Sequence, residues 1–157
     1  SIAAFESDRA ANDGDTITFG TQFNTPTTIT LLQGQILIAK SLTIAGPGSS
    51  SLSISGNNAG RIFRISDGAV VSLSGMTLRD GRIGTSANDV FGGGIWVTDS
   101  TLSLTNMVLQ NNTARFSGTN PTITLGFGGA IALYNSVLSV TTSRISNNDG
   151  HTFGGIY

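Results

Sequence analysis

The residues of this chain that could do acid–base or ion-binding chemistry are aspartates in repeated positions. Asp67 stands in "SDG" and Asp99 in "TDS", and Asn135 follows at the equivalent place in "YNS". Stacked carboxylates could bind calcium, or act as the acid–base pair of a polysaccharide lyase or hydrolase. A cleavage site needs several converging carboxylates, whereas the 9 acidic residues of the chain are scattered. We therefore interpret these positions as turn residues. We predict no catalytic, cofactor-binding or metal-binding residue, with calcium the one ion left open.

Aromatic and arginine side chains are the candidates for partner binding. One predicted outward column holds Arg64, Trp96, Ala132 and Tyr157, and its neighbour holds Ser66, Thr98 and Tyr134. Aromatic rings stack on sugar rings, and an arginine can lie over a tryptophan as a cation–π pair. The alternative is that inserted segments, with their phenylalanines, pack over this face. The candidate partner-binding face comprises Arg64, Phe91, Trp96, Phe116, Phe127 and Tyr134.

An internal repeat must position these residues. "GGGIWVTDSTLSLTNMVLQNN" (92–112) is followed 36 residues later by "GGAIALYNSVLSVTTSRISNN" (128–148), and residues 63–81 form an earlier copy. Each copy contains three short strands with period-2 alternation, and one copy cannot enclose its own apolar side chains. Stacked copies with parallel strands can. The predicted inward columns are Phe63/Ile95/Ile131/Ile156, Ile65/Val97/Leu133, Leu42/Val71/Leu102/Leu138, Ile44/Leu73/Leu104/Val140 and Leu78/Leu109/Ile145.

Paired asparagines recur at one corner of the repeat. Asparagine tolerates left-handed backbone geometry, and its amide can bond to the backbone and to an asparagine stacked above it. We interpret these side chains as a structural ladder rather than a ligand site. The ladder comprises Asn58, Asn111, Asn112, Asn147 and Asn148, with Asn57 beside it. The glycines at 92–94, 128–129 and 154–155 are expected to permit tight corners.

The fold expected from this pattern is all-β: a right-handed parallel β-helix with a short amphipathic helix at its N-terminal end. Apolar residues in 1–12 have helical spacing, and the period changes to 2 from Asp15 onward. The predicted division is therefore an N-terminal cap over residues 1–14 and β-helix coils over 15–157.

Several phrases resemble a known family. "GDTITF", "SLTIAGPG", "LSISGNNAGRIFRI" and "GAVVSLSGMTLRDG", together with the repeat, resemble bacterial surface right-handed parallel β-helix proteins with polymorphic-outer-membrane-protein-like repeats. The resemblance implies a secreted or surface-exposed protein, associated with the outer membrane and acting in adhesion. It also implies a capping role for the N-terminal segment, and it carries over no catalytic residue. Because the last copy stops at Tyr157, we expect further coils beyond it, or strand edges open to end-to-end or lateral self-association.

Composition narrows the function. A formal net charge of −1 gives no electrostatic reason to bind nucleic acid, and no apolar run approaches the roughly 20 residues of a membrane span. We therefore expect a non-enzymatic extracellular β-solenoid, serving as an adhesin or structural surface module. Its expected partners are a glycan, a matrix component or a neighbouring surface protein. The alternatives are a pectin-degrading type of lyase or hydrolase, and a shaft segment of an extracellular filament or sheath.

Overall fold

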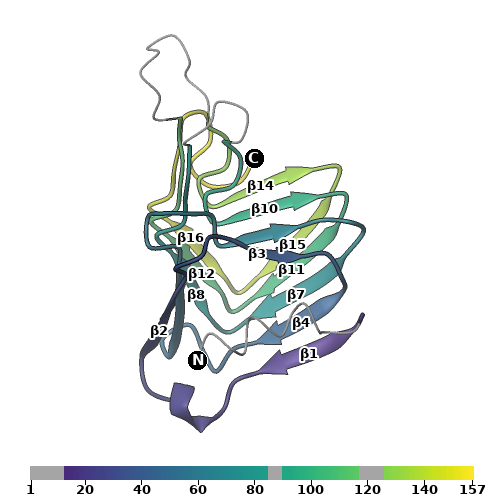
Figure 1. Cartoon of the computed structure of the whole chain (residues 1–157), viewed down its shortest axis with the longest axis vertical. Coiled ribbons are helices and arrows are strands. Elements are labelled where there is room, and N and C mark those ends of the chain that lie inside the picture. Colours follow the sequence, from purple (N-terminus) through teal and green to yellow (C-terminus); the bar gives the residue numbers. More distant parts are fainter. Residues whose placement is uncertain (1–12, 85–89, 117–125) are drawn as a thin grey trace.

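The chain is an all-β structure built from parallel sheets (Figure 1). The computed structural model describes residues 13–84, 90–116 and 126–157. The predicted helix within residues 1–12 lies outside the described residues. A single-turn 3-10 helix, η2 (Thr21–Phe23), follows β1 and buries Phe23.

Three sheets carry most of the strands. Sheet A contains β1 (Asp15–Thr18), β4 (Leu42–Ala45), β7 (Val70–Ser74), β11 (Thr101–Thr105) and β15 (Val137–Thr141). Sheet B contains β2 (Thr27–Thr30), β5 (Leu52–Ser55), β8 (Thr77–Arg79), β12 (Val108–Gln110) and β16 (Arg144–Ser146). Sheet C contains β3 (Ile36–Ile38), β6 (Phe63–Ile65), β10 (Ile95–Thr98) and β14 (Ile131–Tyr134).

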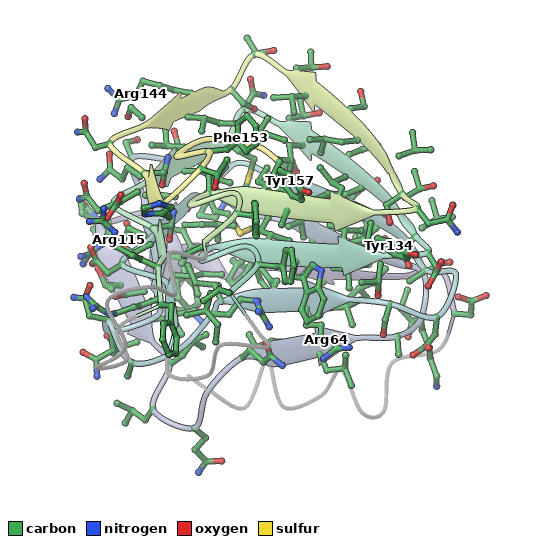
Figure 2. All side chains as sticks on the ribbon, turned by 90° about the horizontal axis from the view of Figure 1, so that it is seen from above. Arg64, Arg115, Tyr134, Arg144, Phe153 and Tyr157 are labelled. Carbon is green, nitrogen blue, oxygen red and sulfur yellow. The ribbon has the colours of Figure 1, made fainter. Side chains whose placement is uncertain are left out.

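The chain passes through sheets C, A and B in that order, and we call one such passage a coil. From β3 onward four coils follow one another, each stacked on the one before (Figure 1). Every recorded pairing between strands is parallel, and the arrangement is compatible with the expected β-helix. Viewed along the stack, the coils have a three-sided outline (Figure 2).

The register confirms the inward columns predicted from the repeat. Ile95 pairs with both Phe63 and Ile131, and Ile131 also bridges to Ile156. Leu102 lies between Val71 and Leu138 in the same way. Because equivalent residues sit directly above one another, each apolar side chain is covered by its counterparts in the neighbouring coils.

Burial follows the position of a coil in the stack. Leu102 and Leu104, in the third coil, are fully buried. Their counterparts in the fourth coil are less enclosed: Leu138 is half-buried, and Val140 is 40% exposed. The difference arises because the described chain places only residues 149–157 beyond that coil.

Residues with left-handed backbone geometry mark the corners. Asp67, Asp99 and Asn135 have φ values of 63°, 50° and 48°, and follow the strands of sheet C. Asp80, Asn111 and Asn147 have φ values of 55°, 56° and 55°, and follow those of sheet B. Aspartate and asparagine tolerate this conformation better than other side chains, which explains their recurrence in the repeat.

Two glycines lie where a side chain could not fit. Gly92 and Gly128 have φ values of 59° and 65°, and a Cβ on either would lie 2.0 Å from the carbonyl oxygen of Ile95 or Ile131. The predicted tight corner before sheet C therefore depends on glycine.

A fourth, narrow sheet was not predicted from the sequence. Sheet D contains β9 (Arg82–Ile83), β13 (Thr113–Ala114) and β17 (Asp149–Gly150), and it lies within the segments that connect sheet B to sheet C. Its parallel pairing aligns the beginnings of these connecting segments. Among the described residues, no helix has the length and apolarity to cross a membrane.

Candidate functional site

The outer face of sheet C carries the predicted arginine–tryptophan pair. Arg64, Trp96 and Ala132 occupy one register position on β6, β10 and β14. The guanidinium carbon of Arg64 lies 4.6 Å from the centre of the Trp96 ring. This is the geometry of a cation–π contact, as expected from the column. Figure 2 shows Arg64, Tyr134 and Tyr157 along this side, while Arg144 projects from another.

A second arginine, not identified from the sequence, lies against the same tryptophan. Arg61 is 1% exposed, and its guanidinium carbon is 4.7 Å from the Trp96 ring centre. Its Nε donates to the carbonyl of Gly92 at 2.9 Å, its Nη2 to that of Phe91 at 2.8 Å, and its Nη1 to Gln35 Oε1 at 2.6 Å. Arg61 therefore fixes the segment that enters β10.

A signal for Arg61 exists in the alignment of the coils. Phe63 pairs with Ile95, so the position two residues before each strand holds Arg61, Gly93 and Gly129 in successive coils. A large charged residue in a column of glycines must find room and hydrogen-bond partners that the glycines do not need.

Aromatic rings from the connecting segments form a continuous cluster over this region. Phe91, Phe127 and Phe153 pair in parallel, one above another. The ring centre of Phe91 lies 5.7 Å from that of Trp96 and 5.3 Å from that of Phe127, and both pairs are stacked. The ring centres of Tyr157 and Phe127 are 4.7 Å apart. We call Phe91, Trp96, Phe127, Phe153 and Tyr157 the aromatic cluster.

The exposed part of the aromatic cluster lies at its last two rings. Phe153 is 47% exposed and Tyr157 is 46% exposed, while Phe91, Trp96 and Phe127 are half-buried. Trp96 thus contacts Phe91 and two guanidinium groups. These contacts agree with the alternative that inserted segments and their phenylalanines pack over this face. Within the aromatic cluster, the most accessible surface is supplied by Phe153 and Tyr157, which are outside the candidate partner-binding face.

Two residues of the predicted face lie apart from the aromatic cluster. Tyr134 is 71% exposed at the end of β14, opposite Thr98. Phe116 is half-buried just after β13. The ring contacts among the described residues do not include either side chain.

A surface depression of about 510 Å³ adjoins Arg64 on the outer face of sheet C. Its lining combines a guanidinium, two carboxylates, two hydroxyls, one amide and one apolar side chain. The lining residues are Gln35, Leu37, Arg64, Ser66, Asp67, Thr98 and Asp99. Its volume falls in the range of about 300–1,000 Å³ typical of small-molecule sites.

The aspartates of this depression form a polar column with Asn135. Asn135 Nδ2 donates to Asp99 Oδ1 at 2.7 Å, and Ser66 Oγ donates to Asp67 Oδ2 at 2.9 Å. Asp80 lies at the corner after sheet B, away from this column, and Asp89 lies outside the described residues. Within the described ranges, no three His, Cys, Asp or Glu side chains gather closely enough to hold a metal ion.

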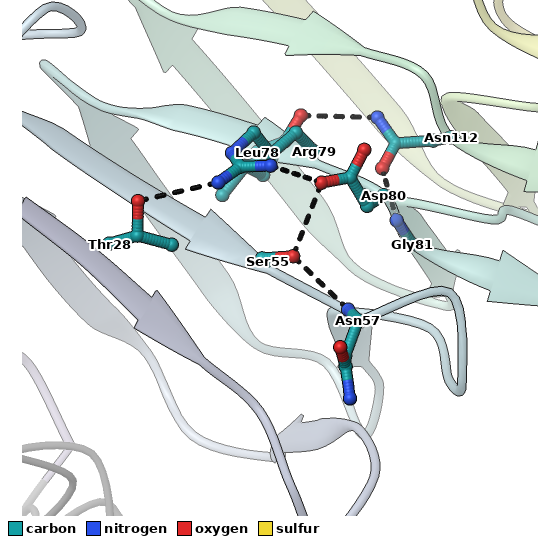
Figure 3. Close-up of polar contacts among 8 residues, drawn as sticks. All are labelled: Thr28, Ser55, Asn57, Leu78, Arg79, Asp80, Gly81 and Asn112. Carbon is teal, nitrogen blue, oxygen red and sulfur yellow. Dashed lines mark hydrogen bonds and ion pairs between the residues drawn. The ribbon is translucent and has the colours of Figure 1, made fainter.

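The paired asparagines form hydrogen bonds between coils. Asn112 is fully buried: its Oδ1 accepts from the Gly81 N–H at 2.9 Å, and its Nδ2 donates to the Leu78 carbonyl at 3.2 Å (Figure 3). Asn148 Oδ1 accepts from both the backbone N–H and Nδ2 of Asn112, at 2.9 and 3.0 Å. These contacts stabilise the corner between sheets B and D.

The earlier members of the ladder behave differently. Asn58 contributes its backbone N–H, which donates to the Asp80 carbonyl at 2.8 Å. Asp80 occupies the corner position that Asn111 and Asn147 hold in later coils, and its carboxylate accepts from Arg79 and Ser55 (Figure 3).

Comparison of the chain with protein-family models, with curated proteins and with solved structures finds no match.

Proposed function

We propose that the chain is a right-handed parallel β-helix with residues 1–14 as its N-terminal cap, displayed outside the cell as a non-enzymatic adhesin or structural surface module. The parallel register of the coils and the family resemblance of the repeat support this architecture. Cell-surface repeat proteins need a stable scaffold that can present one face to a partner, and stacked coils provide such a scaffold.

The observation that carries the proposal is the continuous aromatic cluster beside sheet C. Its last two rings, Phe153 and Tyr157, are 47% and 46% exposed, and they lie where the last connecting segment reaches β14 of sheet C. Variable segments on one side of a regular scaffold are a common location for partner binding. Aromatic side chains are enriched at binding surfaces because they offer large contact area with few rotatable bonds.

The rings are also held in place before any partner arrives. Tyr157 contacts Phe91, Phe127 and Phe153, and Phe91 is fixed in turn by Arg61. A surface that is already ordered loses little conformational entropy on binding. The partner classes that suit it are a glycan, a matrix component or a neighbouring surface protein, since an aromatic ring can stack on a sugar or anchor in a protein pocket.

The test is binding of the purified chain to immobilised glycans and matrix proteins. We expect saturable binding by the wild type and at least a tenfold loss in the double variant Phe153→Ser/Tyr157→Ser. The matched control is Leu32→Ser, because Leu32 is 72% exposed and lies between β2 and β3, near the other end of the stack. Equal binding by the wild type and the double variant would contradict the proposed role of the aromatic cluster. Circular dichroism checks that all three proteins are folded.

A further inference from the structure

We propose that the depression on the outer face of sheet C binds a linear, neutral glycan chain that lies along the axis of the stack. This inference rests on the proposed function and assigns it a ligand class and a second contact surface. The residues that would contact the glycan are Leu37, Arg64, Ser66, Asp67, Thr98 and Asp99.

The spacing of Asp67 and Asp99 in the lining, continued beyond it by Asn135, indicates a linear ligand. Asp67, Asp99 and Asn135 stand at the same corner in three successive coils. Adjacent parallel strands are about 4.8 Å apart, so this corner offers one polar group at that interval. The sugar residues of an extended β-1,4-linked hexose chain follow one another at a similar interval; alternate residues are turned over, but each carries hydroxyls on both of its edges. One sugar residue could therefore meet one coil.

The chemistry of the lining suits neutral sugars. Asp67 and Asp99 are exposed carboxylates whose orientation is set by hydrogen bonds from Ser66 and Asn135. An ionised carboxylate has about four lone-pair sites, so each retains acceptor capacity for sugar hydroxyls. Two carboxylates and one guanidinium give the lining a net negative charge, which disfavours a polyanionic glycan.

Donor and apolar groups complete the surface. Arg64 supplies guanidinium donors, and its contact with Trp96 limits the conformations that it can adopt. Leu37, 52% exposed at the first strand of sheet C, offers an apolar patch for the C–H face of a sugar. Tyr134 stands beside Thr98 at the upper end, where a longer chain would pass its ring. The strands β3, β6, β10 and β14 carry Leu37, Arg64, Thr98 and Tyr134, which keeps these side chains ordered.

The single tryptophan of the chain allows a direct measurement. Trp96 fluorescence should change saturably on titration with cellohexaose, because the sugar would contact Arg64, which lies over the indole. Hexagalacturonate, the anionic counterpart, should bind at least tenfold more weakly. Isothermal titration calorimetry gives the same two affinities without relying on the tryptophan.

The site variant is Asp67→Gly/Asp99→Gly. Glycine accepts the φ values of 63° and 50° at these positions, so the side chains are removed without backbone strain. We expect cellohexaose to bind at least tenfold more weakly, since the variant removes two charged hydrogen-bond acceptors from the lining. Asn111→Gly is the matched control, because Asn111 has a φ of 56° at the corner after sheet B. The affinity of Asn111→Gly for cellohexaose should equal that of the wild type, and Phe153→Ser/Tyr157→Ser should also retain cellohexaose binding.

The outcomes separate this inference from the proposed function. Unchanged cellohexaose affinity in Asp67→Gly/Asp99→Gly, or tighter binding of hexagalacturonate, would overturn the glycan site. The glycan site would also be overturned if the wild type did not bind cellohexaose but bound other immobilised partners through Phe153 and Tyr157. In that case the proposed function stands. Shortening of cellohexaose during the titration would retain the site and overturn the non-enzymatic role.

Discussion

Asn112 and Asn148, equivalent residues of successive coils, are joined twice through one oxygen atom. Asn148 Oδ1 accepts from the backbone N–H of Asn112 at 2.9 Å and from its Nδ2 at 3.0 Å. Asn148 Nδ2 in turn donates to the carbonyls of Leu109 and Ser146, both at 3.0 Å. The two side chains thus replace strand pairing at a corner where the backbone cannot continue its ladder. Polar groups that are buried need such partners.

Replacing Asn112 with alanine should lower the free energy of unfolding by about 3 kcal/mol, because it leaves the Gly81 N–H without its acceptor in a buried site. Urea denaturation followed by circular dichroism measures the change. Asn24→Ala is the matched control, since Asn24 is exposed, with backbone angles of φ −75° and ψ −13° that alanine adopts. A loss at Asn112 no larger than that at Asn24 would contradict a structural role for the ladder.

Replacing Thr142 with asparagine should stabilise the protein by about 1 kcal/mol, because a β-branched residue at positive φ is strained. Thr142 has a φ of 48°. The equivalent position in the two preceding coils holds Gly75 and Asn106, with φ values of 62° and 53°. The measurement is the urea midpoint at constant denaturant slope. Thr141→Asn, on the preceding β15 residue, is the control and should give no gain. A lower midpoint for Thr142→Asn would contradict the strain argument.

The columns of the fold could be predicted because a repeated alternation leaves few alternatives. Once Ile95 aligns with Ile131, every neighbour in sheet C follows, and a slip by one residue would place the apolar side chains outside. The pairing of Arg64 with Trp96 was predictable for the same reason. The strand register that the repeat predicts therefore aligns the outward residues of sheet C as well as its core residues.

The connecting segments could not be predicted in this way. Phe91, Phe127 and Phe153 each stand directly before paired glycines, which aligns them in the sequence, but the alignment does not show that their rings contact Trp96 and Tyr157. The strands of sheet D are two residues long, which is too short for any alternation to be visible. Arg61 was missed because its partners are backbone carbonyls that only the folded segment brings close.

Replacing Ser100 with alanine should stabilise the protein by about 1 kcal/mol, because a buried hydroxyl without a partner costs free energy. Ser100 Oγ is the one buried side-chain polar atom among the described residues that lacks a hydrogen bond. Ala69 is the equivalent residue one coil below. Its N–H donates to the Ser66 carbonyl at 3.3 Å and therefore forms no hydrogen bond with Ser100 Oγ. Thermal and urea unfolding measure the gain.

Ser136→Ala is the matched control for Ser100→Ala. Ser136 Oγ accepts from the Ser100 N–H at 3.1 Å and donates to the Tyr134 carbonyl at 2.7 Å. Its removal should therefore destabilise the protein by about 1 kcal/mol. Opposite signs for the two substitutions are expected, and a loss of stability in both would show that Ser100 has a partner in solution, such as water.

Replacing Arg61 with methionine should lower the free energy of unfolding by about 3 kcal/mol, because the carbonyls of Phe91 and Gly92 lose a buried donor. Methionine keeps much of the side-chain length and removes the charge. The segment before β10 would then be held mainly by its backbone pairing, and Phe91 would lose its fixed position over Trp96. We therefore expect a shift in Trp96 fluorescence in the folded protein, before any unfolding.

Arg82→Met is the control, since Arg82 is exposed on β9 and its substitution should leave both stability and fluorescence unchanged. If Arg61→Met changed stability but not the fluorescence of the folded state, the arginine would support the core without positioning the aromatic cluster.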